Sequence, residues 1–212
     1  MCSLFCIMKS ILVGYIIGII ISIPLGPSAI ESVNRTISRG FKEGLVVSLG
    51  AVSADITYLF FVNCGIFSLF KLSKDTEALF WTLSGVVMIL IGYSSLSNKE
   101  VKKSQNVSKK CDAFFTGYVI TLCNPMTPTL WITLSATVLN RWHSKGGFLY
   151  TLSILSMIGG MISWFILLNV SALKGLKLAK PKHSNKITII IRWSILVLGI
   201  IFSALGIYKF FT

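Results

Sequence analysis

The chain is poor in acidic residues and histidine, and these shortages argue against an enzyme. Seven Asp and Glu stand against 20 Lys and Arg in 212 residues. The two histidines, His143 and His183, belong to no HExxH pattern and have no carboxylate cluster near them in the sequence. Metal-assisted or general acid–base catalysis needs such a cluster. We therefore expect a protein that is not an enzyme and that holds no cofactor and no metal.

Cysteine is also scarce. The five cysteines are odd in number and form no CxxC pattern, so neither a disulfide framework nor a zinc site is predicted. A thiol-shuttling protein remains a rival interpretation, since Cys64 and Cys123 both lie deep in apolar runs. Packing residues with ordinary thiols are the simpler reading.

Charged residues are scarce within several long apolar stretches of the sequence. The composition is 54% hydrophobic and 13% charged, with a mean hydropathy of +0.79. Several runs reach the roughly 20 residues that a membrane-spanning helix needs, and none alternates as an outer-membrane strand does. The sequence predicts an all-α membrane protein of six spans in a single domain, with runs at about 11–23, 44–69, 78–96, 113–139, 147–173 and 187–211.

The net charge of +13 would suggest nucleic acid as a partner in a soluble protein. Here the cations lie almost wholly in the connections between runs, where they act as topological signals and lipid contacts, so we expect membrane lipid and no nucleic acid as a partner. Thirteen lie on the side of connections 1–2, 3–4 and 5–6, and six lie on the other side. The side with more cations is expected to lie in the cytoplasm, and both termini are expected to lie outside.

No signal-peptide cleavage is expected after Lys9, because no small-x-small site follows.

The first apolar run is interrupted at Ile23 to Ser28 after only about thirteen residues, too few for a span. Pro24 and Pro27 remove backbone donors, and Gly26 lets another backbone or a solute approach. Such backbone is tolerated at membrane depth only beside protein or a water-filled cavity. We interpret this stretch as half of a solute-binding site.

Residues Ser28 to Lys42 are expected to form an amphipathic helix with Pro27 at its first position. Glu31 and Arg35 are four residues apart and can pair as a solvated helix end. Alternatively, Glu31 belongs to a substrate or proton site, because it lies one turn beyond the break. Both readings stay open.

The second run carries Gly44, Ser48, Ala51 and Asp55 on one helical stripe, which must face protein or water. Asp55 lies about 16 Å along the axis from Gly44, near the middle of the membrane. It is the one acid deep in an apolar run, and burying it costs at least ~2.5 kcal/mol. Asp55 is therefore a candidate substrate-binding and proton-coupling residue, with a structural hydrogen bond as the alternative.

The fourth run repeats the break. Pro125 and Pro128 follow Pro24 and Pro27 at the same spacing, each 101 residues later, and Asn124 can cap a new helix at this point. An odd number of spans per repeat makes the second repeat inverted. We expect two inverted three-helix repeats with broken first and fourth helices, at about 8–97 and 113–212, joined by a polar loop at 98–112. Glycine pairs seven apart in the third and sixth runs predict close helix contact: Gly85, Gly92, Gly199 and Gly206.

At these residues the chain resembles the LysE/RhtB family of bacterial amino-acid exporters. The matching motifs are Pro24-Leu25-Gly26-Pro27, then Ser38-Arg39-Gly40 and Gly44, then Gly50 with Ala54-Asp55, and finally Asn124-Pro125. The resemblance implies a six-span fold in the bacterial cytoplasmic membrane and export of amino acids or related metabolites, coupled to an ion gradient. Met126 follows where the family more commonly has lysine, so the resemblance names no substrate.

Two half-helix starts near the membrane midplane suit an anionic group such as a carboxylate, with Asp55 facing an ammonium group or carrying a proton. A channel, or an exporter of a solute other than an amino acid, remains an alternative. The expected partner is a small-molecule substrate, and a homo-oligomer is possible. The residues expected to bind substrate are Pro24, Gly26, Pro27, Ser28, Glu31, Asp55, Asn124, Pro125 and Thr127.

Overall fold

The computed structural model describes residues 4–23, 26–64, 74–97, 108–178 and 181–211. This part of the chain consists of helices joined by short connections and contains no strand, which confirms the all-α class. The helices are α1 (Leu4–Ser22), α2 (Pro27–Arg39), α3 (Phe41–Asn63), α5 (Lys74–Ser97), α6 (Ser108–Leu122), α7 (Met126–Leu134), the π-helix η1 (Ser135–Leu139), α8 (Asn140–His143), α9 (Gly147–Leu178) and α10 (Pro181–Phe211).

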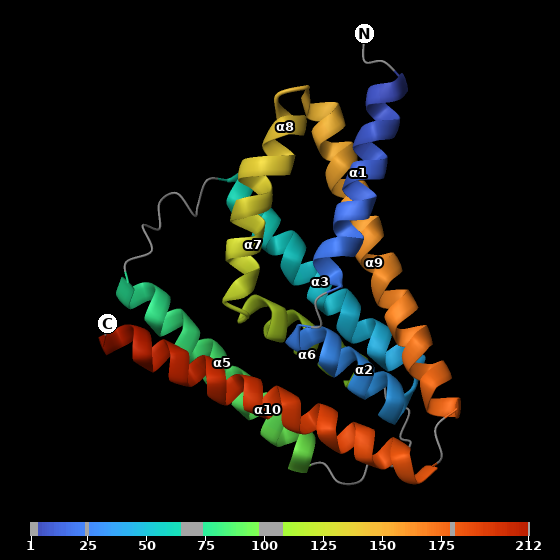
Figure 1. The fold of residues 1–212 in the computed structure, drawn as a ribbon, viewed down its shortest axis with the longest axis vertical. Helices are drawn as coiled ribbons and strands as arrows, with labels where there is room; N and C mark the ends of the chain where they lie inside the picture. The colour runs from blue at the N-terminus through green and yellow to red at the C-terminus, as the bar shows by residue number, and fades with distance from the viewer. Residues whose placement is uncertain (1–3, 24–25, 65–73, 98–107, 179–180, 212) are drawn as a thin grey trace.

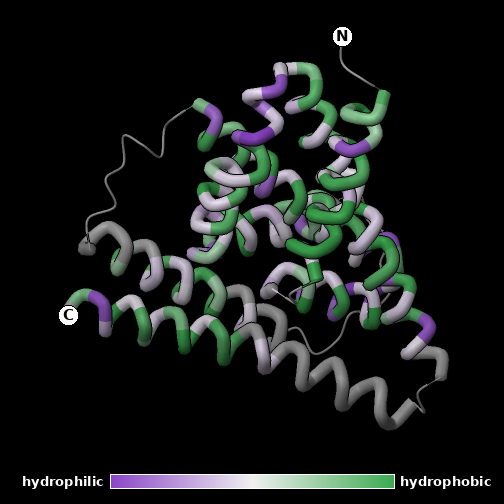
Figure 2. The backbone as a smooth tube through the Cα atoms, turned by 45° about the horizontal axis from the view of Figure 1, so that its top comes forward, coloured by the Kyte–Doolittle hydropathy of each residue, from purple (hydrophilic) through white to green (hydrophobic). Residues whose placement is uncertain are grey.

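Three of these helices are long and apolar enough to cross a membrane, at Leu4–Ser22, Phe41–Asn63 and Gly147–Gly175. The expectation that the run before the first break is too short for a span is therefore wrong, because α1 begins at Leu4 and has 19 residues. Shorter apolar stretches lie at Trp81–Leu90, Cys111–Leu122 and Leu196–Phe210. Figure 2 shows hydrophobic residues along most helices, and hydrophilic ones at the turn beside the N-terminus. The large exposed apolar area fits a protein whose surroundings are lipid, because a soluble protein rarely leaves patches of this size uncovered.

Two of the apolar runs are interrupted where their prolines stand. Helix α1 ends at Ser22 and α2 starts at Pro27, while α6 ends at Leu122 and α7 starts at Met126. Proline lacks an N–H group and cannot continue a helix from the preceding turn, so each run divides into two helical pieces.

The helix expected from Ser28 to Lys42 is shorter in the structure, and that expectation is corrected here. Helix α2 ends at Arg39, and α3 begins at Phe41. Gly40 between them has a φ of +102°, a conformation that side chains other than glycine rarely adopt. This single residue turns the chain from α2 into α3.

Other helices extend beyond their apolar runs. Helix α6 begins at Ser108, within the stretch expected to be a polar loop, and α9 continues to Leu178 in the lysine-rich connection before α10. Hydropathy marks the part of a helix that lies in lipid, and its polar ends continue outside that part.

Small residues let neighbouring helices approach closely. A methyl group added at Gly18 of α1 would collide with the backbone of Met157 in α9, and one at Gly117 of α6 would collide with Val47 in α3. Helices α5 and α10 lie side by side in Figure 1. The expected contacts of Gly85, Gly92, Gly199 and Gly206 are confirmed, since each of these glycines closely approaches the other helix of this pair.

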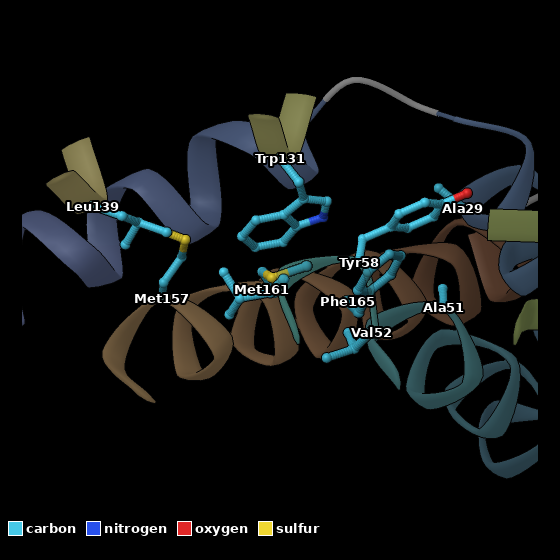
Figure 3. Close-up of a cluster of buried hydrophobic side chains, with 10 residues drawn as sticks. Ala29, Ala51, Val52, Tyr58, Trp131, Leu139, Met157, Met161 and Phe165 are labelled. Atoms are coloured by element: carbon cyan, nitrogen blue, oxygen red, sulfur yellow. The ribbon is translucent and has the colours of Figure 1, made fainter. Parts of the chain in front are cut away.

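The core lies where α2, α3, α7, η1 and α9 meet. Trp131 of α7 is its largest fully buried side chain. Figure 3 shows the Trp131 ring pointing into this cluster, with Met161 of α9 beneath it and Tyr58 of α3 to one side. The core therefore fixes α7, which follows the second break, against α3, which carries Asp55.

Candidate functional site

A cavity of about 580 Å³ lies between the two breaks. Its wall includes the start of α2, the start of α7 and the middle of α3, with Met161 and Phe165 of α9 and Leu198 and Phe202 of α10 closing it. Six residues singled out from the sequence line this one cavity: Gly26, Pro27, Ser28, Asp55, Asn124 and Thr127. Segments about 100 residues apart in the chain thus share one space, as the sequence predicts.

Asp55 is partly exposed to this cavity. One of its oxygens, Oδ1, accepts a hydrogen bond of 2.9 Å from Nε1 of Trp131. Among the described residues, no Lys or Arg lies within 4.0 Å of the carboxylate. A carboxylate held by one neutral donor and facing a cavity can accept a proton or a ligand ammonium group.

Both half-helices open their N-termini towards the cavity. In α2, Gly26 has extended backbone and Pro27 stands at the first helical position. Before α7, the Asn124 side chain accepts a hydrogen bond of 3.2 Å from the Met126 N–H. The N-cap residue is Pro125 and not Asn124, so the helix starts one residue later than the sequence predicts. The first N–H groups of a helix lack partners within it, and the positive end of its dipole attracts anions. Two such ends around one cavity suit a ligand carboxylate.

Thr121 of α6 belongs to this site but was not predicted from the sequence. Its side chain is 5% exposed and lines the cavity, and its Oγ1 has no hydrogen-bond partner among the described residues. A buried hydroxyl without a partner is costly, and a bound polar ligand would remove that cost. The sequence signal was weak, because threonine is common in apolar helices.

The other predicted residues are placed differently. Pro24 lies outside the described residues, and Pro125 is buried between two lining residues without lining the cavity itself. Glu31 does not line the cavity. It is 3% exposed, and its Oε1 pairs with Nε of Arg35 at 2.9 Å. The expected pairing is confirmed, although this helix end is buried where the sequence suggested solvent.

Arg35 joins three helices on the side away from the N-terminus. Besides Glu31 on its own helix, its guanidinium contacts Asp112 at 3.1 Å and Thr116 at 2.8 Å on α6. Glu43 at the start of α3 lies 3.9 Å from the same group. The planar fork of arginine can serve several oxygen acceptors at once, which a lysine cannot do with the same geometry.

A buried polar network lies beside this ion pair and was also missed. Asn169 of α9 donates to Ser48 Oγ at 3.1 Å and accepts from Ser32 Oγ at 2.9 Å and from Thr36. The Oγ atoms of Ser32 and Ser48 are also hydrogen-bonded to each other at 2.7 Å. The network ties α2, α3 and α9 together, and it includes Gly44 and Ser48 of the small-residue stripe of α3. A single amide within the fifth apolar run is the signal that could have revealed Asn169.

The described residues contain no group of three His, Cys, Asp or Glu side chains that could hold a metal ion. The cavity is lined instead by hydroxyls, one amide, one carboxylate and apolar side chains. This mixture can bind a small organic solute with both a charged and an apolar part.

Comparison with known proteins finds a family and a relative that this chain resembles. The family model of the LysE type translocator matches residues 19–209. A protein of Bacillus subtilis (strain 168) named "Putative amino acid efflux protein YcgF" is 27% identical over 207 residues, which cover 93% of this chain and 97% of that relative. No solved structure matches the chain. The match spans both helix breaks and Asp55, and the chain belongs to the LysE type translocator family.

Proposed function

We propose that this translocator exports amino acids or closely related small metabolites across the cytoplasmic membrane of a bacterium. One observation carries the proposal: two half-helix N-termini and the Asp55 carboxylate line a single cavity. An amino acid carries an anionic and a cationic group on one carbon, so a cavity that offers both a positive and a negative feature complements it. The name of the B. subtilis relative supports the same solute class.

Within this proposal, the solute carboxylate binds at the starts of α2 and α7, near Ser28 and Thr127. The ammonium group binds near Asp55 and the Thr121 hydroxyl. The apolar side chains of Met161 and Phe165 then contact the solute side chain. Glu31, Pro24 and Pro125 act indirectly, by holding the two helix starts in place.

Export against a gradient needs an energy source, and we propose protons. Asp55 is the candidate carrier, because its carboxylate has one neutral donor and no cation within 4.0 Å among the described residues. Protonation of Asp55 would weaken its attraction for an ammonium group, and this links proton binding to solute release.

We further propose that the chain forms six spans as two inverted repeats, at about 8–97 and 113–212, with both termini outside the cell. The common spacing of the two proline pairs and the bias of cations towards one side support this arrangement. Rocking of the repeats would open the cavity to each side in turn. Arg35 lies in the first proposed repeat, and Asp112 lies directly before the second one. In this proposal their ion pair closes one side of the cavity and breaks when that side opens.

Cells that overproduce the protein test this function. They should tolerate toxic amino-acid analogues better than cells without it, and their content of the exported amino acid should fall. Unchanged tolerance and content across a broad panel of amino acids would overturn the proposal. Flux that does not saturate and ignores the proton gradient would favour a channel.

A further inference from the structure

A second cavity, of about 550 Å³, lies nearer the N-terminal end of α1. Three of the seven residues that line it are cations: Lys9 of α1, Arg141 of α8, and Lys145 in the turn before α9. All three are exposed, and none has an acidic partner within 4.0 Å among the described residues. Lys145 lies over the ring of buried Trp142, 5.0 Å from its centroid, which holds its charge at the cavity.

The sequence explains why these charges stay uncompensated. All seven acids of the chain lie between Glu31 and Asp112. Helix α1 and the whole segment from η1 to residue 212 therefore contain no acidic residue. A cavity that is lined by cations and apolar side chains concentrates anions, because its low-dielectric walls focus the electric field of the cations.

The two cavities have two walls in common. Helix α1 supplies Ser22 and Ile21 to the Asp55 cavity and Lys9 and Val13 to the second one. The column of α7, η1 and α8 supplies the facing wall of both. Figure 1 shows α1 and this column rising together towards the end of the molecule that holds the N-terminus. One of the two cavities thus lies at each end of the seam between α1 and this column.

A row of threonine hydroxyls runs along α7 and η1 from one cavity to the other. Thr129 and Thr133 line the Asp55 cavity, and Thr137 lines the second, so three exposed threonines follow one another over about 12 Å at one-turn spacing. Thr133 and Thr137 donate their protons to the carbonyls one turn earlier, which leaves their oxygens as acceptors. The π-helix η1 interrupts the α-helical hydrogen bonding at this level, and such interruptions are frequent at functional sites.

We propose that the seam between α1 and the α7–α8 column is the exit route, and that the cationic cavity selects solutes without net positive charge. This inference rests on the proposed export function and narrows its substrate class to zwitterionic and anionic amino acids. The threonine oxygens accept hydrogen bonds from the ammonium group as it passes. The three cations attract the carboxylate and repel a second positive charge, so amino acids with cationic side chains leave poorly.

Thiol labelling tests the cavity without any need for transport. In a background without native cysteines, a cysteine in place of Thr137 should react with an anionic methanethiosulfonate on the order of tenfold faster than with a cationic one. Lys9→Gln, Arg141→Gln and Lys145→Gln together should abolish this preference. A matched set with the same loss of charge elsewhere, Arg39→Gln, Lys42→Gln and Lys174→Gln, should leave it intact. Equal rates with both reagents in the parent would overturn the cationic cavity.

Transport then tests the route. Labelling at residue 137 should block export, whereas labelling of a cysteine in place of Thr151, on the exposed side of α9, should not. The triple Gln variant at residues 9, 141 and 145 should raise export of lysine relative to a neutral amino acid by several-fold. Normal export after labelling at residue 137 would overturn the route. An unchanged export ratio in the triple variant would overturn the proposed selection. If the melting temperature of that variant also responds differently to phosphatidylglycerol, the cavity binds lipid instead. A parent that exports no amino acid contradicts the proposed function instead, while the reagent preference still reports on the cavity.

Discussion

The sequence predicts that Asp55 is a candidate functional residue, but it does not predict the contact of Asp55 with Trp131. The isolation of Asp55 among apolar residues marks it as costly in lipid and therefore as a candidate for function. Its hydrogen bond to Trp131 could not be predicted, because the two residues are 76 positions apart and meet only when α7 packs on α3. Thr121 likewise becomes notable only in the structure, where its buried hydroxyl has no hydrogen-bond partner among the described residues.

We predict that Asp55→Asn abolishes proton-coupled export while the protein still folds. Asparagine keeps the size of the side chain and can still accept the Trp131 N–H, but it cannot bind a proton or attract an ammonium group by charge. Uptake into inverted vesicles with an imposed proton gradient measures the effect, and elution from a sizing column in detergent reports folding.

The control for this variant is Asp75→Asn, which makes the same change at an acid that the sequence places outside the apolar runs. It should retain transport. A wild-type rate and pH dependence in the Asp55→Asn protein would assign Asp55 a purely structural role.

At the scale of whole helices, Arg35 and Asn169 explain how α2 is held although it is too short to span a membrane. Glu31 and Arg35 stand four apart, so their pairing could be read from the sequence. Their contacts with α6, and the network of Ser32, Thr36, Ser48 and Asn169, join helices that are far apart in the chain. Periodicity says which face of a helix is polar, but not which helix covers that face.

We predict that Arg35→Gln destabilises the protein by about 3 kcal/mol, because the buried Glu31 carboxylate loses its ionic partner and keeps the hydrogen bond from the Asn34 amide. Adding Glu31→Gln should recover part of this loss, since the unpaired buried charge is then removed. Thermal unfolding in detergent measures both variants. Arg39→Gln on the same helix serves as the control and should change the melting temperature little, because no ion pair of Arg39 is found among the described residues. If the double variant is no more stable than Arg35→Gln alone, the pairing with Glu31 does not explain the role of Arg35.

For the molecule as a whole, proline positions carried most of the information about the fold and the site. Both helix interruptions lie at the proline pairs. Six of the nine residues expected to bind substrate, Asp55 and five residues at or beside these prolines, line the cavity. Helix ends were less predictable: Gly40 divides a stretch that reads as one helix, because amphipathic periodicity continues on both sides of it. The relation between the two proposed repeats rests on a spacing of 101 residues, so it needs a direct measurement of distance across the cavity.

We predict that cysteines in place of Ser28 and Thr127 cross-link through a short bifunctional thiol reagent when the native cysteines are absent. Both residues line the Asp55 cavity, one at the start of α2 and the other at the start of α7. If the repeats rock about this cavity, a bound amino acid should slow the reaction by occupying the space between the two helix starts. Cysteines in place of Ser28 and Thr151 form the control pair, since Thr151 lies ten residues before the cavity residue Met161, about 15 Å along α9. Equal cross-linking of the two pairs, or no effect of any exported amino acid, would separate the two helix starts from the binding site and leave the proline pairs with a structural role alone.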